Sequence, residues 1–211
     1  MRKLCQILLL PLLLCAGVAV GLLVCVPNCV ADGMLPDFLL IALVAQVGFG
    51  LGNNGDFIKQ LRMAGLRTLL LPFFTILGTL AVTSVVSLFV RDLSCCDVLA
   101  AGSGFGYYSL SSMLILDFKE ASAGVDAAAL LASISLLANV FRELIALSCC
   151  GMFARLGSVS AAISLAGINS MDVCLPLIFP GEGGKPMMSA AIIHGIILEV
   201  LVPILICALC V

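Results

Sequence analysis

The amino-acid sequence predicts an all-α polytopic membrane protein with about seven membrane segments. Of its 211 residues, 63% are hydrophobic and only 10% are charged, and the mean hydropathy is +1.28. A soluble domain has about a quarter of its residues charged, so this chain carries too few charges to cover a surface that faces water. Several apolar runs also reach the length of about 20 residues that a helix needs to cross the hydrocarbon core. We therefore expect one transmembrane domain over 1–211.

The expected membrane segments follow one another along most of the chain. They are 4–30, 35–52, 66–90, 97–116, 122–150, 158–179 and 186–211. The first begins with the basic residues Arg2 and Lys3, as a signal peptide would. Its apolar part is too long for a signal peptide, however, and no A-x-A cleavage site follows, so we expect a retained span.

The Lys and Arg residues between the segments predict the orientation, because cytoplasmic loops carry an excess of them. We assume seven full crossings and a cytoplasmic N-terminus. The basic residues outside are then Arg91 and Arg155. Those inside are Arg2, Lys3, Lys59, Arg62, Arg67, Lys119 and Lys185. If either interrupted segment re-enters instead of crossing, the later loops change sides.

Two of the segments, 97–116 and 158–179, are interrupted by glycines and polar residues. Non-helical backbone at membrane depth is tolerated only where protein or a water-filled cavity satisfies its polar groups. In secondary transporters, a pair of broken helices marks the substrate site. The stretches SGFGYYSLSSMLI (103–115) and AGINSMDVCLPLI (166–178) align at an offset of 63 residues. The likeness is slight, and we treat an internal, inverted repeat as a hypothesis.

Five ionisable residues lie inside the later segments, where insertion of each charged side chain into the membrane costs about 3 kcal/mol. They are Arg142, Glu143, Asp172, His194 and Glu199. Arg142 and Glu143 are successive on a helix, so their side chains point about 100° apart. Asn139 shares the face of Glu143, and we expect both to line a polar cavity. Arg142 then faces another partner, for which Asp172 is the candidate; a structural ion pair is the alternative reading.

Asp172 lies in the interrupted stretch GINSMDVCLP, beside Asn169 and Ser170. Pro176 removes a backbone donor and frees a carbonyl one turn earlier. A carboxylate among freed carbonyls and amide oxygens suits an ammonium group or a small cation, so we expect Asp172 to bind substrate or carry a proton. A capping role at the start of a half-helix is the alternative.

The remaining candidates add hydroxyl and titratable groups. Tyr108, Ser109 and Ser111 follow the glycine-rich interruption and suit a cavity wall. His194 is the only histidine and is either a packing residue or a proton carrier. Glu199 does not share its face. It either lines the same cavity, faces a partner subunit or pairs with Arg142.

Other kinds of function find little support in the sequence. The net charge of −2 excludes a basic nucleic-acid surface. Most of the 11 cysteines fall inside apolar runs, where they act as small hydrophobes. We find no metal-ligand cluster, no catalytic triad, and no strand before GSGFGYYS to support nucleotide binding. We expect neither an enzyme nor a bound cofactor or metal.

Five stretches in the same order resemble the bacterial lysine exporter family LysO. They are FLLIALVAQVGFGLGNNG (38–55), SGFGYYSLSS (103–112), RELIA (142–146), NSMDVCLPLI (169–178) and HGIILEVLVPIL (194–205). The resemblance implies export of L-lysine, and of analogues such as thialysine, across the bacterial cytoplasmic membrane by proton antiport. It makes Glu143 and Asp172 the central acids, with His194 and Glu199 as further proton-coupling candidates.

The sequence departs from the family pattern at three points. Tyr107 replaces a tryptophan, and Glu199 stands where a small residue is expected. Full-length members also carry additional N-terminal spans, so we expect this chain to be the larger, C-terminal part of a split exporter. A small membrane protein would supply the missing spans, or self-association would replace them. The residues leave open another cationic amino acid or small cation as substrate, and a non-transporting subunit that stabilises a partner.

Overall fold

The computed structural model describes residues 66–90, 92–179 and 185–210, together with six isolated helical residues before them. The chain divides into two compact units, 1–42 and 43–211, and the features below belong to the second. The expected segments 4–30 and 35–52 lie outside the described residues, apart from the isolated positions. Our expectation of a single domain over the whole chain stays a prediction.

The part of the chain that the structure describes contains helices and no strands. Three helices are long and apolar enough to cross a membrane: α5 (Leu66–Ser87), α8 (Val125–Arg155) and α11 (Lys185–Cys210). They coincide with the predicted segments 66–90, 122–150 and 186–211. Large apolar side chains such as Phe73, Phe74 and Leu77 point outward from α5, as lipid-facing residues do. The prediction of an all-α membrane protein is confirmed.

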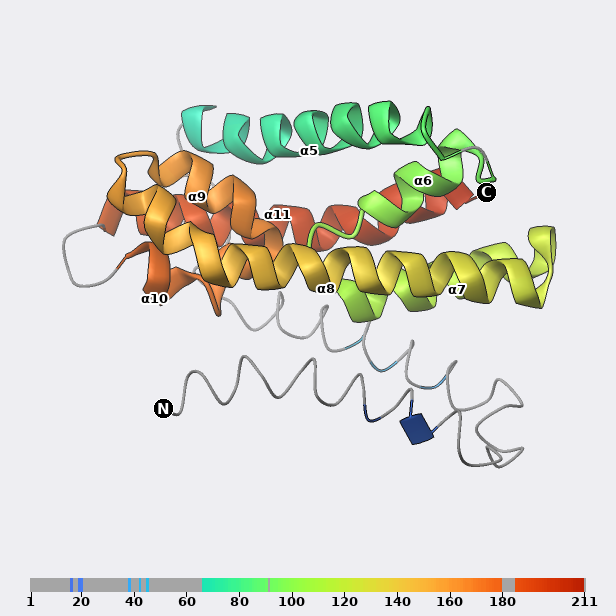
Figure 1. Ribbon diagram of the computed structural model, residues 1–211. Coiled ribbons are helices and arrows are strands. Elements are labelled where there is room, and N and C mark those ends of the chain that lie inside the picture. Colours follow the sequence, from blue (N-terminus) through green and yellow to red (C-terminus); the bar gives the residue numbers. More distant parts are fainter. Residues whose placement is uncertain are drawn as a thin grey trace. The chain divides into compact units, whose positions relative to one another are not determined.

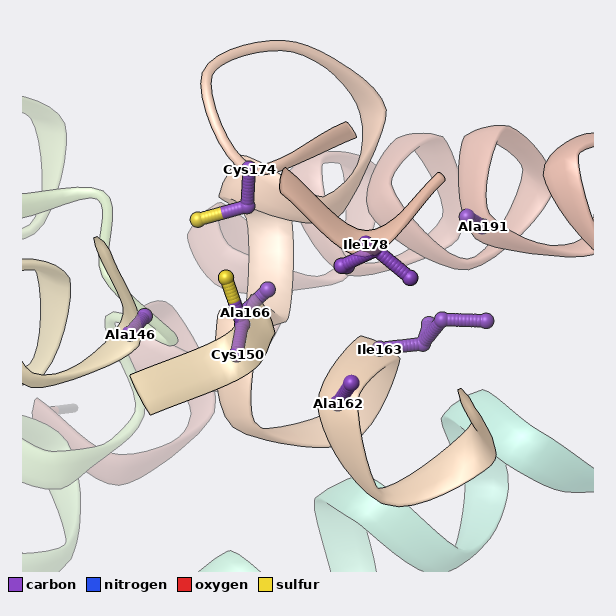
Figure 2. Close-up of a cluster of buried hydrophobic side chains, with 8 residues drawn as sticks. All are labelled: Ala146, Cys150, Ala162, Ile163, Ala166, Cys174, Ile178 and Ala191. Atoms are coloured by element: carbon purple, nitrogen blue, oxygen red, sulfur yellow. The ribbon is translucent and has the colours of Figure 1, made fainter. Parts of the chain in front are cut away.

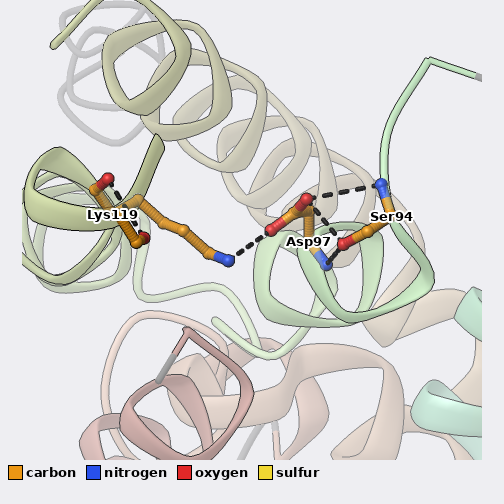
Figure 3. Close-up of polar contacts among 4 residues, drawn as sticks. Ser94, Asp97 and Lys119 are labelled. Atoms are coloured by element: carbon orange, nitrogen blue, oxygen red, sulfur yellow. Dashed lines mark hydrogen bonds and ion pairs between the residues drawn. The ribbon is translucent and has the colours of Figure 1, made fainter. Parts of the chain in front are cut away.

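The first interrupted segment forms a helical hairpin. It consists of α6 (Cys95–Gly102), a non-helical tip and α7 (Tyr108–Ala123). The Nζ atom of Lys119, near the end of α7, lies 2.8 Å from a carboxylate oxygen of Asp97, at the start of α6 (Figure 3). Asp97 also forms a reciprocal capping box with Ser94. Both arms of this hairpin therefore return to the same end of the bundle.

The second interrupted segment forms a hairpin at the opposite end. It consists of α9 (Val159–Ala166), the short 3₁₀-helix η1 (Gly167–Met171) and α10 (Leu175–Ile178). Both arms pack on α8. The second arm comes close to its last turns, because a methyl group placed on Gly151 would lie 3.2 Å from the carbonyl oxygen of Leu177.

A cluster of fully or nearly fully buried side chains, most of them small, holds the second hairpin to α8 and α11 (Figure 2). Its members are Ala146, Cys150, Ala162, Ile163, Ala166, Cys174, Ile178 and Ala191. Small residues let helix backbones approach closely, which is the main source of helix–helix attraction in lipid. The cysteines Cys150 and Cys174 are free thiols here and act as packing residues, as the sequence predicted.

The same order of elements occurs twice: a long helix followed by a hairpin. Leu71, near the start of α5, packs on the cluster at the end of α8, whereas Thr83, near the end of α5, meets Gly102 of the first hairpin. The helices α5 and α8 therefore run antiparallel, and their hairpins enter from opposite ends (Figure 1). This arrangement is that of an inverted repeat. Both interrupted segments turn back as hairpins, which favours re-entry over crossing, the question that the sequence left open.

Candidate functional site

The tips of the two hairpins, residues 103–107 and 167–171, meet inside the bundle; we call their meeting place the tip junction. The backbone N–H of Ile168 donates a hydrogen bond to the carbonyl of Phe105 at 3.2 Å. Gly167 has a φ of +61° and packs directly on that carbonyl, so any side chain at this position would overlap it. Only glycine combines this backbone conformation with so close an approach.

Asn139 of α8 closes the first tip. Its side-chain oxygen accepts a hydrogen bond from the backbone N–H of Gly106 at 2.9 Å. Its amide nitrogen donates to the carbonyls of Ala101 at 3.1 Å and Ser135 at 2.9 Å. We expected Asn139 to contact substrate, but the structure uses its amide to satisfy backbone groups that the broken helix leaves free.

Ser111 has a similar supporting position. It is fully buried, its hydroxyl donates to the carbonyl of Tyr108 at 3.3 Å, and it accepts a hydrogen bond from Ser135 at 3.2 Å. Tyr108 and Ser109 are half-buried in the first turn of α7, and their expected role in a cavity wall stays a prediction.

The second tip is held by a chain of polar side chains from α11, α5 and α9. The hydroxyl of Ser170 donates to the carbonyl of Ala191 at 2.9 Å and lies 3.3 Å from Nδ1 of His194. Nε2 of His194 lies 3.0 Å from the hydroxyl of Thr75, which in turn lies 2.8 Å from the hydroxyl of Ser164. Ser170 and His194 are fully buried. Of the two roles we considered for His194, this geometry favours the packing role.

Arg142 lies between the two tips. Its guanidinium carbon lies 5.4 Å from the centre of the Phe105 ring. A guanidinium nitrogen donates a hydrogen bond to the carbonyl of Ser164 at 3.3 Å. We expected Arg142 to form an ion pair with Asp172 or Glu199, but among the described residues the ion pair recorded is that of Lys119 with Asp97. An aromatic face and a carbonyl give a guanidinium favourable partners without an acid, so Arg142 joins the tips instead.

Three carboxylates from separate elements gather beside the junction: Glu143 of α8, Asp172 after η1 and Glu199 of α11. We call them the acidic cluster. Asp172 lies within electrostatic range of both Glu143 and Glu199. Asp172 is exposed and the other two are half-buried. One carboxylate oxygen of Glu143 is buried without a hydrogen-bond partner among the described residues.

Two tyrosines border the acidic cluster. Tyr107 lies within electrostatic range of Glu199, and Tyr108 lies within range of Glu143. Of the three positions that we considered for Glu199, its proximity to Asp172 favours the one that it shares with the other acids. The two residues at which the sequence departs from the family pattern, Tyr107 and Glu199, lie within electrostatic range of each other.

Sequence reasoning did not select several residues that build this site. Thr75, Phe105, Ser135 and Ser164 all hold the tips in place. Thr75 also donates to the carbonyl of Leu71 in its own helix, as hydroxyls in apolar helices commonly do. Its sequence context therefore carried no signal of the long-range contact with His194.

The described residues contain no group of three or more His, Cys, Asp or Glu side chains placed to hold a metal ion. Seven cysteines in the described part are free thiols. Our expectation that the protein needs neither metal nor cofactor stays a prediction.

Two broken helices that enter from opposite ends, meet inside a bundle of apolar helices and carry acids at their junction form the kind of arrangement found in membrane transporters built from inverted halves. The chain belongs to the lysine exporter LysO family, whose model matches residues 11–210.

Two relatives support this membership. The chain is 36% identical over 171 residues to "Lysine exporter LysO" of Escherichia coli K12, a match that covers 81% of this chain and 53% of that protein. It is 29% identical over 168 residues to "Putative lysine exporter" of Haemophilus influenzae Rd, covering 80% of each. The chain thus spans about half the length of the Escherichia coli relative. No solved structure matches the chain.

Proposed function

We propose that this chain exports L-lysine across the bacterial cytoplasmic membrane in exchange for protons. The observation that carries the proposal is the acidic cluster of Glu143, Asp172 and Glu199 at the junction of two broken helices. Three carboxylates at membrane depth are costly unless they bind cations or protons. The two relatives, which are named as lysine exporters, support lysine as the cation. Lysine analogues such as thialysine carry the same two ammonium groups and bind in the same way.

The proposed mechanism follows from the electrostatics of carboxylates in a low dielectric. An isolated buried carboxylate takes up a proton, whereas a carboxylate beside an ammonium group releases it. Lysine therefore binds the deprotonated cluster from the cytoplasm, and protons displace it once the site opens outward. Glu143 and Asp172 are the central residues of this exchange, and Glu199 adds a third titratable group.

The proposed orientation places the N-terminus in the cytoplasm. If segments 4–30 and 35–52 both cross and the two hairpins re-enter, Lys119 moves to the outside and Arg155 to the inside. Seven basic residues then lie inside and Arg91 and Lys119 lie outside, which preserves the excess that the positive-inside rule requires. The acids near the tip junction would then be reached from both sides in turn.

Efflux of labelled lysine from bacterial cells that lack their own lysine exporter tests the proposal. The cells express this chain alone, or together with the part of the Escherichia coli relative that lies outside the matched region, because we also propose that a second membrane protein or a second copy completes the site. We expect efflux to fall by at least about tenfold in Glu143→Gln and in Asp172→Asn, since each removes one charged contact worth about 1.5–3 kcal/mol. Ser133→Ala is the matched control, because its exposed hydroxyl bonds only within α8.

The outcomes separate the alternatives. Efflux that is lost in both acid variants at unchanged membrane expression supports an acid-dependent lysine exporter. Efflux of ornithine or arginine but not of lysine would keep the mechanism and replace the substrate. No efflux of any cationic amino acid in either arm would favour a non-transporting subunit. Efflux in only the second arm supports the need for a partner.

A further inference from the structure

The start of α7 is an open donor site at the tip junction. The helix is 16 residues long, and no side chain among the described residues caps its N-terminus at Tyr107. The first N–H groups of a helix have no partner within it and carry a partial positive charge. In a hydrocarbon surrounding, such groups need a partner. Helix starts of this kind bind anionic groups in proteins.

The side chain of Asn169 offers a second donor at the same place. Asn169 is only 8% exposed, and its amide nitrogen has no hydrogen-bond partner among the described residues. That nitrogen lies 3.5 Å from the point where a β-carbon of Gly106 would be, one residue before the N-cap of α7. The backbone of Asn169 is fixed, because its carbonyl accepts a hydrogen bond from Cys174 at 2.9 Å. The unpaired amide therefore lies beside the start of α7, where Gly106 leaves space.

The opposite kind of charge lies immediately beside these donors. Tyr108, the first residue of α7, lies within electrostatic range of Glu143 of the acidic cluster. Arg142 adds a positive charge on the other side of the junction, above Phe105. A diamine would satisfy only the acids and leave the donors without a partner. A molecule with both a carboxylate and an ammonium group satisfies both sets.

We propose that the uncapped N-terminus of α7 and the Asn169 amide bind the α-carboxylate of the transported molecule, while the acidic cluster binds its ammonium groups. This inference rests on the proposed function and narrows its substrates to cationic α-amino acids. It also reverses the expected role of Asn169, which the sequence had placed beside an ammonium group. The subsite distinguishes α-amino acids from amines that have no carboxylate. The acidic cluster distinguishes cationic molecules from neutral or anionic ones.

Competition in proteoliposomes tests the subsite with ligands that differ only in this group. Full-length chain, in whichever arm of the efflux assay is active, exchanges labelled lysine against unlabelled lysine, lysinamide or 1,5-diaminopentane. Lysinamide keeps both ammonium groups but has no carboxylate, and the diamine has no carboxyl carbon at all. We expect lysine to compete at about 10- to 100-fold lower concentration than lysinamide or 1,5-diaminopentane, because both of these ligands lose the charged hydrogen bonds of the carboxylate.

Substitutions at Asn169 then test which residue reads the carboxylate. Asn169→Asp replaces the donor with an anion, and we expect the preference for lysine over 1,5-diaminopentane to narrow by at least about tenfold. Asn169→Ala should narrow it less. The readout is the ratio of the concentrations at which lysine and 1,5-diaminopentane compete. Simple destabilisation of the protein would not change this ratio. Ser133→Ala again serves as the control, and its ratio should equal that of the wild type.

Two results would overturn the inference, and they differ from failure of the proposed function. Equal competition by lysine, lysinamide and the diamine in the wild type would show that no carboxylate is recognised. A wild-type preference for lysine that survives unchanged in Asn169→Asp would place recognition elsewhere. In both cases lysine exchange itself persists. Absence of lysine exchange in every arm would instead contradict the proposed function.

Discussion

The two hairpin tips are built by the same principle but are completed to different degrees. The first tip is fully buried at Ser103 and Phe105, and the amide of Asn139 satisfies the backbone on both sides of the break. The second tip is anchored through Ser170 alone among its side chains. Its neighbour Asn169 keeps an amide nitrogen without a hydrogen-bond partner among the described residues, and Asp172, just after the tip, is exposed and accepts a hydrogen bond only from the backbone N–H of Val173.

This difference separates support from ligand chemistry. A buried polar group without a partner costs about 1–3 kcal/mol, so such groups are rare unless a ligand pairs with them. In the first tip, the backbone that Asn139 satisfies acts as a support, whereas the start of α7 just after it stays uncapped. The second tip holds the unpaired amide of Asn169, and the exposed carboxylate of Asp172 follows it. We propose that these two residues meet substrate together with the start of α7, whereas Asn139 only supports the tip. The first of the following three predictions tests this division. The other two test the contact between the tips and the ion pair at the base of the first hairpin.

The largest effect is expected from Asn139→Leu in the first tip. The substitution leaves the N–H of Gly106 buried without a partner, and the carbonyls of Ala101 and Ser135 each lose the bond from the Asn139 amide. The carbonyl of Ala101 keeps only the hydroxyl of Ser135, at 3.3 Å. The unpaired donor and the two lost bonds together predict a loss of about 3–5 kcal/mol in the free energy of unfolding. Thermal unfolding in detergent, followed by helical circular dichroism, measures it.

The comparison for this variant is Asn169→Leu in the second tip. The side chain of Asn169 has no hydrogen-bond partner among the described residues, so its loss should change the unfolding temperature little. Equal destabilisation by the two substitutions would contradict the division into a supporting tip and a ligand-binding tip.

An intermediate effect is expected from Gly167→Ala, which tests the contact between the tips. Gly167 and Gly157 both have positive φ, +61° and +88°, but only Gly167 packs on another backbone, that of Phe105. Alanine at Gly157 should cost about 1 kcal/mol from backbone strain alone. Alanine at Gly167 should cost about 2–4 kcal/mol, because an overpacking term adds to the strain.

The same unfolding measurement compares the two glycine variants, and the difference between them isolates the contact. Gly124, with a φ of +84° and nothing nearby, provides a second control. Similar losses at all three positions would mean that the close approach of Gly167 to Phe105 does not contribute to stability.

The smallest effect is expected from the ion pair at the base of the first hairpin (Figure 3). Hydrogen bonding to Asp97 raises the pKa of Lys119, so the pair is charged at neutral pH. Pairs of this kind contribute about 0.2–1 kcal/mol. A double-mutant cycle with Lys119→Gln and Asp97→Asn measures the coupling.

The sign of the pH dependence follows from the raised pKa. The contribution of Lys119 is present below its unfolded pKa of about 10.4 and is lost as the pH rises through the folded value. The coupling energy should therefore vanish in strongly alkaline buffer. A coupling energy near zero at pH 7 would show that this pair does not hold the hairpin arms together.

Much of the site could be predicted from single residues. Burying Glu143 and Asp172 in apolar segments is costly wherever they point, so their identity alone marked them as functional candidates. The glycines and polar residues at 103–107 and 167–172 likewise marked two breaks. The partners of Arg142 and Asn139 could not be predicted, because the same side chains can pair with acids, carbonyls or aromatic rings equally well.

What the sequence determined by itself was the helical membrane class, the position of the three long helices at 66–87, 125–155 and 185–210, and the two breaks between them. These follow from hydropathy and backbone preference, which are local properties. The tertiary structure alone decided that each broken segment turns back, that Asn139 closes one tip, and that Glu199 joins the other acids. Each of these depends on contacts between distant residues, such as Phe105 with Ile168 and Asp97 with Lys119. Their geometry is set only when the whole bundle packs.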